Sequence, residues 1–195
     1  MKMKIEVLKE KPQRIELKLT GFSQSLANAL RRTIISDLPA FAIDRVDFYE
    51  NNTVLFNEYL ANRLGLIPLT YDDSLAEDTQ ITFTLNAESI DEHKTVYAKE
   101  LVSTDPKVKV YSENIPVVKL GGNQRLRLEA VAVKGTGKKH AKFQCALSSM
   151  ELLDEKKGDY KMFIESYNNV PAKQHLKTAI EILKQDCDEL KKELK

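Results

Sequence analysis

The chain has 195 residues, of which 42% are hydrophobic and 30% charged, a composition typical of globular proteins rather than disordered or fibrous ones. The charges leave a net charge of +1, whereas a protein that binds nucleic acid over its whole surface is normally far more basic. The length predicts one large domain or two small ones, with a core large enough to fold without disulfides or metal.

The sequence has neither a membrane-spanning segment nor a cysteine framework. Its longest uninterrupted apolar runs have four residues, as at Ala130 to Val133, far short of the roughly 20 residues that cross a bilayer. The N-terminus is charged and has no signal-peptide core. The two cysteines, Cys145 and Cys187, lie far apart and form no Cys-x-x-Cys motif, which argues against a disulfide, a zinc site or an iron–sulfur site. We therefore expect a cytoplasmic protein.

The first third of the chain alternates between strand and helix patterns. Apolar and charged residues alternate over Met3–Lys9 and Gln13–Thr20, which predicts an antiparallel pair with one solvated face. Ser23 is placed to cap a helix that ends before Pro39. That helix carries an apolar stripe at helical spacing, which consists of Leu26, Leu30 and Ile34.

The middle of the chain is predicted to be mostly strand. Over Phe41–Tyr49 the alternation is out of phase between Ile43 and Val46, which indicates a bulge or a change of covering partner. Asn57 is expected to cap a short helix that closes at Gly65. Further strands are predicted at Gln80–Leu85, Thr95–Ala98, Val108–Tyr111, Arg125–Val133 and Lys161–Tyr167.

The last predicted element is a helix from about Ala172 to Leu194, about 33 Å long. Its apolar residues follow a near-heptad spacing, typical of a seam that packs against another element. They are Leu176, Ile180, Leu183, Cys187, Leu190 and Leu194. If fully buried, such side chains are worth about 1.5–3 kcal/mol each, so we expect something to cover the seam. The pattern leaves open whether the cover is the chain's own sheet or a second subunit.

No catalytic or metal site emerges from the sequence. The segment Gly135–His140 is rich in glycine and lysine, but it lacks the earlier glycine and the following Ser or Thr of a phosphate-binding P-loop. We interpret it as an exposed loop that is either merely solvated or docks an acidic or phosphate-bearing partner. The three histidines, His93, His140 and His175, are scattered without ligand spacing. The acidic pair Asp72-Asp73 is interpreted as a surface loop.

Arg31 and Arg32 lie in the middle of the first helix, beside its apolar stripe. Two interpretations remain open for them. A solvated helix face is the default, but paired guanidinium groups are also preferred at buried interface ion pairs.

These segments together resemble a known family. The segment from Gly21 to Pro39, with Asn28 and Leu30-Arg31-Arg32, resembles the first helix of the alpha-type assembly subunits of cellular RNA polymerases. The segment Val54–Leu69 ends in Arg-Leu-Gly-Leu-Ile-Pro-Leu and looks like the second signature of that family. Three further segments, Asp105-Pro106, Ile115–Leu120 and Gly135–Phe143, are similar to the archaeal, D-type members of the family. The resemblance covers nearly the whole chain.

The resemblance implies an α+β fold of two domains. Residues 1–38 and 150–195 would form a discontinuous α/β dimerisation domain with a long C-terminal helix, and residues 39–149 an inserted, mainly β domain. The implied function is that of a non-catalytic scaffold in DNA-directed RNA polymerase, a nucleotidyltransferase complex. The chain would pair with the smaller subunit L and form a platform for subunits N and P and the second-largest catalytic subunit, with no specific DNA contact of its own.

The resemblance also assigns roles to residues. The expected dimer interface consists of Phe22, Leu26, Leu30, Ile34, Leu176, Ile180, Leu183, Cys187 and Leu190. The expected docking residues for the large subunit are Asn28, Arg31, Arg32, Glu58, Arg63, Lys138, His140 and Lys142. No catalytic residue, metal ligand or cofactor is expected in this chain.

One departure from the family bears on the cofactor. Many members carry a ferredoxin-like domain with cysteine-ligated iron–sulfur clusters after the Ile-Pro-Leu segment, but here Thr70–Asp78 follows and no cysteine precedes Cys145. We therefore expect no cluster. The alternative function is a freestanding nucleic-acid-binding module that uses the basic loop Lys134–Lys142, although the near-zero net charge disfavours it. A small hydrolase or metalloenzyme lacks any clustered nucleophile, base or ligand set.

Overall fold

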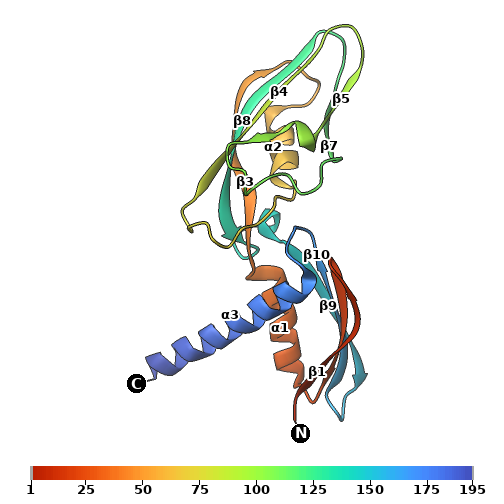
Figure 1. The fold of residues 1–195 in the computed structure, drawn as a ribbon, viewed down its shortest axis with the longest axis vertical. Coiled ribbons are helices and arrows are strands. Elements are labelled where there is room, and N and C mark those ends of the chain that lie inside the picture. Colours follow the sequence, from red (N-terminus) through yellow and green to blue (C-terminus); the bar gives the residue numbers. More distant parts are fainter. Residues whose placement is uncertain (1, 195) are drawn as a thin grey trace. The chain divides into compact units, whose positions relative to one another are not determined.

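The computed structural model describes residues 2–194 and has an α+β fold, as predicted. The chain forms two compact units (Figure 1). Unit 1 consists of residues 1–39 with 136–195, and unit 2 of residues 40–135. Residues 136–149, which the resemblance assigns to the inserted domain, belong to unit 1, because strand β9 (Ala146–Asp154) pairs with β10 (Asp159–Ser166) of that unit.

Unit 1 is built on a four-stranded antiparallel sheet covered by two helices (Figure 1). The strands are ordered β1 (Lys4–Lys11), β2 (Arg14–Thr20), β10 and β9. Every second side chain of β2, from Ile15 to Leu19, is buried, as the alternation predicted. Helices α1 (Gln24–Ser36) and α3 (Ala172–Glu193) pack on the sheet and on each other.

The start of α1 confirms the predicted cap. The Leu26 amide donates to Ser23 Oγ at 3.2 Å, and Ser23 has extended backbone angles. This hydroxyl satisfies one of the amide groups that a helix leaves without a partner at its N-terminus. The helix ends before Pro39, because the residue that precedes a proline disfavours helical angles.

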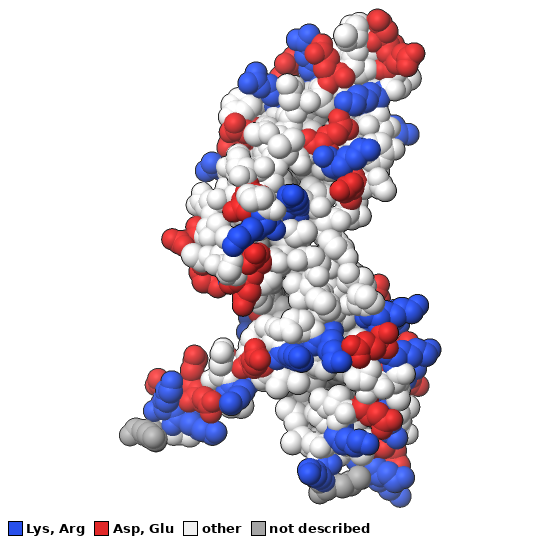
Figure 2. Space-filling view, viewed as in Figure 1, with Lys and Arg blue, Asp and Glu red and all other residues white. Residues whose placement is uncertain are grey.

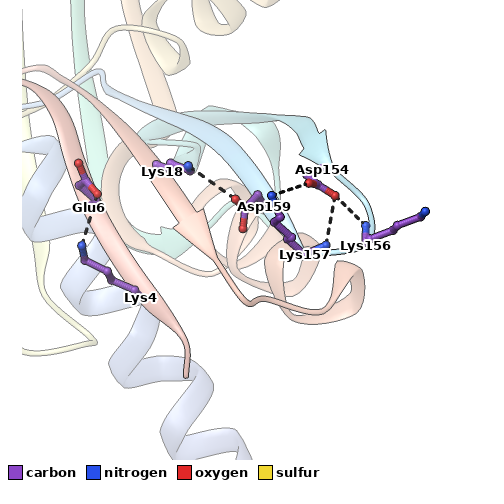
Figure 3. A network of polar contacts seen from close by, with 7 residues as sticks. All are labelled: Lys4, Glu6, Lys18, Asp154, Lys156, Lys157 and Asp159. Atoms are coloured by element: carbon purple, nitrogen blue, oxygen red, sulfur yellow. Dashed lines mark hydrogen bonds and ion pairs between the residues drawn. The ribbon is translucent and has the colours of Figure 1, made fainter. Parts of the chain in front are cut away.

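The turn between β9 and β10 packs against the chain just before α1. Gly158 has φ +64°, and its carbonyl accepts the Phe22 amide at 3.1 Å. A Cβ at Gly158 would clash with the Phe22 backbone, so glycine is required there. Figure 3 shows how the turn is closed: Asp154 accepts the backbone amides of Lys156 and Lys157 and pairs with the Lys157 side chain. In the same view Lys18 reaches Asp159 across the adjoining strands.

Unit 2 is mainly β and has its own core. One sheet has the order β3 (Pro39–Asn51), β8 (Gln124–Thr136), β4 (Gln80–Ser89) and β6 (Val102–Ser103). A second, two-stranded sheet joins β5 (Lys94–Tyr97) to β7 (Pro116–Leu120). Helix α2 (Asn57–Gly65) buries Leu60 and Leu64 in the core. The short helices are η1 (Ala98–Glu100) and, in unit 1, η2 (Ala141–Phe143).

Several local predictions are corrected by the structure. Phe56, not Asn57, is the N-cap of α2, and Asn57 is its first helical residue. The segment Val108–Tyr111 is not a strand, since only Val110 forms a bridge, to Leu69. The strands β7 and β9 were not among the predicted strands.

The phase change within β3 corresponds to a change in burial along the strand. Ala40–Ile43 are buried at four consecutive positions, and the pattern then becomes mostly exposed. A strand covered on both faces reads as a continuous apolar run, whereas one with a solvated face alternates. The structure therefore favours a change in covering over the alternative of a bulge.

Candidate subunit interface

The two ends of α3 have very different surroundings. Its first two turns bury Ala172, Leu176 and Ala179. From Lys184 onward every described residue is exposed, and the end of the helix projects from its own unit (Figure 1). The seam residue Leu190 is 66% exposed. The seam is thus covered by the chain's own sheet only near Leu176, and its distal half has no cover within the described part of the chain.

A buried polar cluster fixes the base of α3. His175 Nε2 lies 3.1 Å from Ser166 Oγ and 3.2 Å from Asn168 Oδ1, and all three residues are buried. The Ala172 amide donates to the Pro12 carbonyl at 2.9 Å. Burial lowers the pKa of His175 to about 4, so the imidazole is neutral at physiological pH and serves as a hydrogen-bonding group.

An apolar groove lies beside the base of α3 within unit 1. It has a volume of about 310 Å³ and is formed by β1, α1 and α3. Its lining residues are Met3, Ile5, Phe22, Leu26, Leu30, Ile180 and Leu183. Figure 2 shows an uncharged strip on unit 1 next to the projecting helix, whose outer end carries charges of both signs. A groove lined entirely by apolar side chains is a candidate surface for a protein–protein contact.

The structure brings together five of the nine expected interface residues in this groove. They are Phe22, Leu26, Leu30, Ile180 and Leu183. Ile34 and Leu176 do not line the groove and are buried in unit 1, at 0% and 8% exposure. Cys187 and Leu190 lie on the exposed part of α3, beyond the groove.

Two groove residues, Ile5 on β1 and Met3 just before it, were missed from the sequence. Ile5 pairs with Leu19, so both face the helices, but only Leu19 is covered. The alternation of Met3, Ile5 and Val7 could have predicted this. Apolar residues at every second position of an edge strand, and just before it, extend the apolar face of the sheet.

The expected docking residues of α1 lie on the side away from the groove, as their spacing from Leu30 requires. Arg31 is half-buried and donates two hydrogen bonds to Asn28 Oδ1, at 2.9 and 3.2 Å. Arg32 is exposed, and its guanidinium has no partner among residues 2–194. Arg31 is therefore held by a hydrogen-bonded neighbour, whereas the adjacent Arg32 has a free guanidinium.

The two expected docking residues in unit 2 differ in their surroundings. Arg63 donates to the carbonyls of Val117 and Pro116 and so ties α2 to β7. Glu58 is exposed on α2. The neighbouring exposed residues are apolar, with Phe56 at 79% and Tyr59 at 63% exposure.

The basic segment, Lys134–Lys142, is held against the rest of the chain more tightly than an exposed loop would be. A Cβ at Gly137 would lie 2.6 Å from the Ile35 carbonyl oxygen, which shows how closely this backbone approaches the end of α1. Lys138 pairs with Asp37 at 2.9 Å, and this hydrogen bond, with a smaller contribution from Asp186, raises the lysine's pKa. His140 Nδ1 accepts the Lys142 amide and caps η2.

Two further lysines of this segment are also engaged. The side chain of Lys134 is 6% exposed and pairs with Glu77 at 2.6 Å. The ammonium of Lys142 lies 5.3 Å from the centre of the Phe143 ring. Much of the segment's positive charge is therefore satisfied locally, which weakens it as a binding surface for phosphates.

The chemically reactive groups do not form a site. Within residues 2–194, no group of three or more His, Cys, Asp or Glu is arranged to hold a metal ion. Burial raises the pKa of the Cys145 thiol to about 12, which makes it a poor nucleophile. Among the same residues, no helix is long and apolar enough to cross a membrane.

Comparison with known proteins places these features in a family. Residues 46–154 match the family profile described as the RNA polymerase Rpb3/RpoA insert domain. The chain is 44% identical over 149 residues to DNA-directed RNA polymerase subunit Rpo3 of Pyrococcus furiosus, an alignment that covers 73% of this chain and 56% of that protein. It is 39% identical over 171 residues to Rpo3 of Methanocaldococcus jannaschii, covering 87% and 85% of the two chains.

The chain thus spans about half the length of several relatives that it matches and most of the length of another. The identity of 39% over 85% of the Methanocaldococcus jannaschii protein extends well beyond the insert domain. By these matches, the chain belongs to the Rpo3 family of archaeal RNA polymerase subunits, the D-type members that its motifs resemble.

Proposed function

We propose that the chain is a non-catalytic assembly subunit of DNA-directed RNA polymerase, which pairs through unit 1 with a smaller subunit of the L type. The observation that carries this proposal is the apolar groove, which continues into the exposed seam of α3. Covering large apolar side chains is worth about 1.5–3 kcal/mol for each one fully buried. Pairing therefore stabilises both chains by mass action.

The paired chains would form the platform for subunits N and P and for the second-largest catalytic subunit. The free guanidinium of Arg32, with Asn28 and Arg31 beside it, is the proposed contact with that large subunit on unit 1. On unit 2, Glu58 and the exposed aromatic residues beside it are the proposed contact. A cytoplasmic location accompanies this role.

Replacing Leu183 with Asp tests the pairing surface. The substitution places an unpaired charge in the groove, and we expect it to weaken binding of the L-type subunit by several kcal/mol. Native mass spectrometry of the co-expressed subunits measures the fraction paired. Gln185→Asp adds the same charge at an exposed position of α3 outside the groove and should pair as the wild type does. Normal pairing of Leu183→Asp would show that this groove is not the interface.

We also propose that the chain binds no iron–sulfur cluster. The segment that follows the Ile-Pro-Leu motif is a short loop in which the Asp72 carboxylate accepts the Ser74 amide and pairs with Lys107. It holds no cysteine, the usual cluster ligand. Purified protein should contain neither iron nor acid-labile sulfide in stoichiometric amounts, and finding both would refute the proposal.

Lysines of the basic segment already pair with carboxylates of the same chain, which argues against the alternative of a nucleic-acid-binding module. Lys134 and Lys138 are both held by carboxylates. A steep salt dependence in the affinity of the isolated chain for DNA or RNA would favour that alternative.

A further inference from the structure

The charges that flank the α3 seam are sorted by sign. Lysines recur at seven-residue spacing on one side, at Lys177, Lys184 and Lys191. The other side has Ala179, Asp186 and Glu193 at the same spacing. Positions seven apart lie nearly above one another on a helix. The seam therefore runs between a lysine row and a side that becomes acidic toward the C-terminus.

The acidic side faces the chain's own unit. Ala179 is fully buried, and Asp186 is close enough to Lys138 to contribute to the raised pKa of that lysine. The charge on this side is thus partly balanced by the basic segment of unit 1. The lysine row is on the opposite side of the seam, since Lys177 and Lys184 are each exposed.

Most of the lysine row is not neutralised within the chain. Lys191 pairs with Asp188 at 3.4 Å, and both side chains are at least half exposed. The side chains of Lys177 and Lys184 have no ion-pair or hydrogen-bond partner anywhere in residues 2–194, although Glu181 and Asp188 follow them at helical spacing. Two positions about two turns apart therefore present free ammonium groups beside exposed apolar surface.

We propose that the partner element covering the seam is an amphipathic helix with carboxylates along the edge that meets Lys177 and Lys184. This inference rests on the proposed pairing function and adds to it the chemistry of the partner. Opposite charges at the rim of an apolar contact steer association and fix orientation. A second copy of this chain packed antiparallel fits less well, because that arrangement would bring lysine row against lysine row.

The test uses the full chain and the L-type subunit of the same polymerase. Lys177→Glu/Lys184→Glu reverses the free charges without touching the groove lining. We expect it to weaken binding about tenfold, because two rim attractions become repulsions. Lys119→Glu/Lys192→Glu changes the net charge equally at exposed positions away from the seam and should bind within about twofold of wild type.

Salt dependence provides a second measurement. Wild-type affinity should fall between about 0.05 and about 0.5 M salt as the ion pairs are screened. The affinity of Lys177→Glu/Lys184→Glu should stay level or rise over the same range, because salt also screens repulsion.

The possible outcomes separate this inference from the function on which it rests. If the wild-type chain does not pair with the L-type subunit, the pairing function fails. If Leu183→Asp and the lysine variant both pair normally, neither the groove nor the lysine row lies at the interface. If Leu183→Asp abolishes pairing while the lysine variant matches its control, the groove is the interface but the acidic partner helix is wrong. A stable self-dimer that persists in the presence of the L-type partner would also overturn the inference. So would loss of binding to a short DNA duplex in the lysine variant with unchanged subunit pairing.

Discussion

At the scale of single residues, His175 links the chemistry of a buried side chain to the position of α3, the helix proposed to pair with the partner subunit. Its imidazole bonds to the Ser166–Asn168 segment at the end of β10 and sits in the first turns of α3. Burial lowers its pKa from 6.5 to about 4. The folded chain therefore binds a proton at His175 less readily than the unfolded chain does.

This difference predicts an acid-sensitive stability. The contribution of neutral His175 is fully present above pH 6.5 and is lost as the pH falls toward about 4. It amounts to up to about 3 kcal/mol in the free energy of unfolding. Urea denaturation across this pH range measures it, and His175→Gln, which cannot titrate, should show a shallower pH dependence. An equal slope in both proteins would contradict the assignment.

At the scale of elements, α3 combines packing within its own unit with the proposed pairing role. Its base is packed into unit 1, with His175, Leu176 and Ala179 buried, whereas Leu190 and Leu194 are exposed. A helix stripe left uncovered contributes little to the stability of its own unit. We expect the uncovered part of the α3 seam to contribute to stability only in the complex with the partner subunit.

A matched pair of substitutions separates the two functions. In the isolated chain, Leu176→Ala should lower the free energy of unfolding by about 2–4 kcal/mol through lost burial and a cavity. Leu190→Ala should change it by less than about 0.5 kcal/mol and yet weaken pairing with the L-type subunit. Chemical denaturation measures the first effect and native mass spectrometry the second. A large loss of stability in Leu190→Ala would mean that the distal seam is covered within the chain.

At the scale of the whole molecule, the surfaces proposed for pairing and for docking are separable on α1. The groove side carries Leu26 and Leu30, and the opposite side carries Asn28 and Arg32. Because the two sets face apart, a change on one side should leave the other intact.

Arg32→Ala should therefore preserve the pair with the L-type subunit while weakening recruitment of the second-largest subunit, by loss of a cation at the contact. Arg31→Ala serves as a comparison, since its guanidinium is already engaged by Asn28. Co-purification of the paired subunits with the large subunit reads out recruitment. Loss of pairing in Arg32→Ala would show that the two surfaces overlap.

The sequence by itself determined the features that local periodicity and capping control. The alternation of β2, the Ser23 cap and the length of α3 were predicted from residue types alone, because backbone geometry fixes the periods of strands and helices. The apolar seam was visible for the same reason. Family membership was also recognisable in the sequence, through the motifs of α1 and α2.

Only the tertiary structure decided which apolar and charged groups remain uncovered. It buried Leu176 and exposed Leu190 on one seam and tied Arg63 to backbone carbonyls. It also added to the groove Ile5 of the edge strand and Met3 just before that strand. It also brought Asp186 near Lys138 while leaving Lys184 unpaired. Such outcomes depend on contacts between segments distant in the chain, and the spacing within one segment does not encode which distant segment covers it.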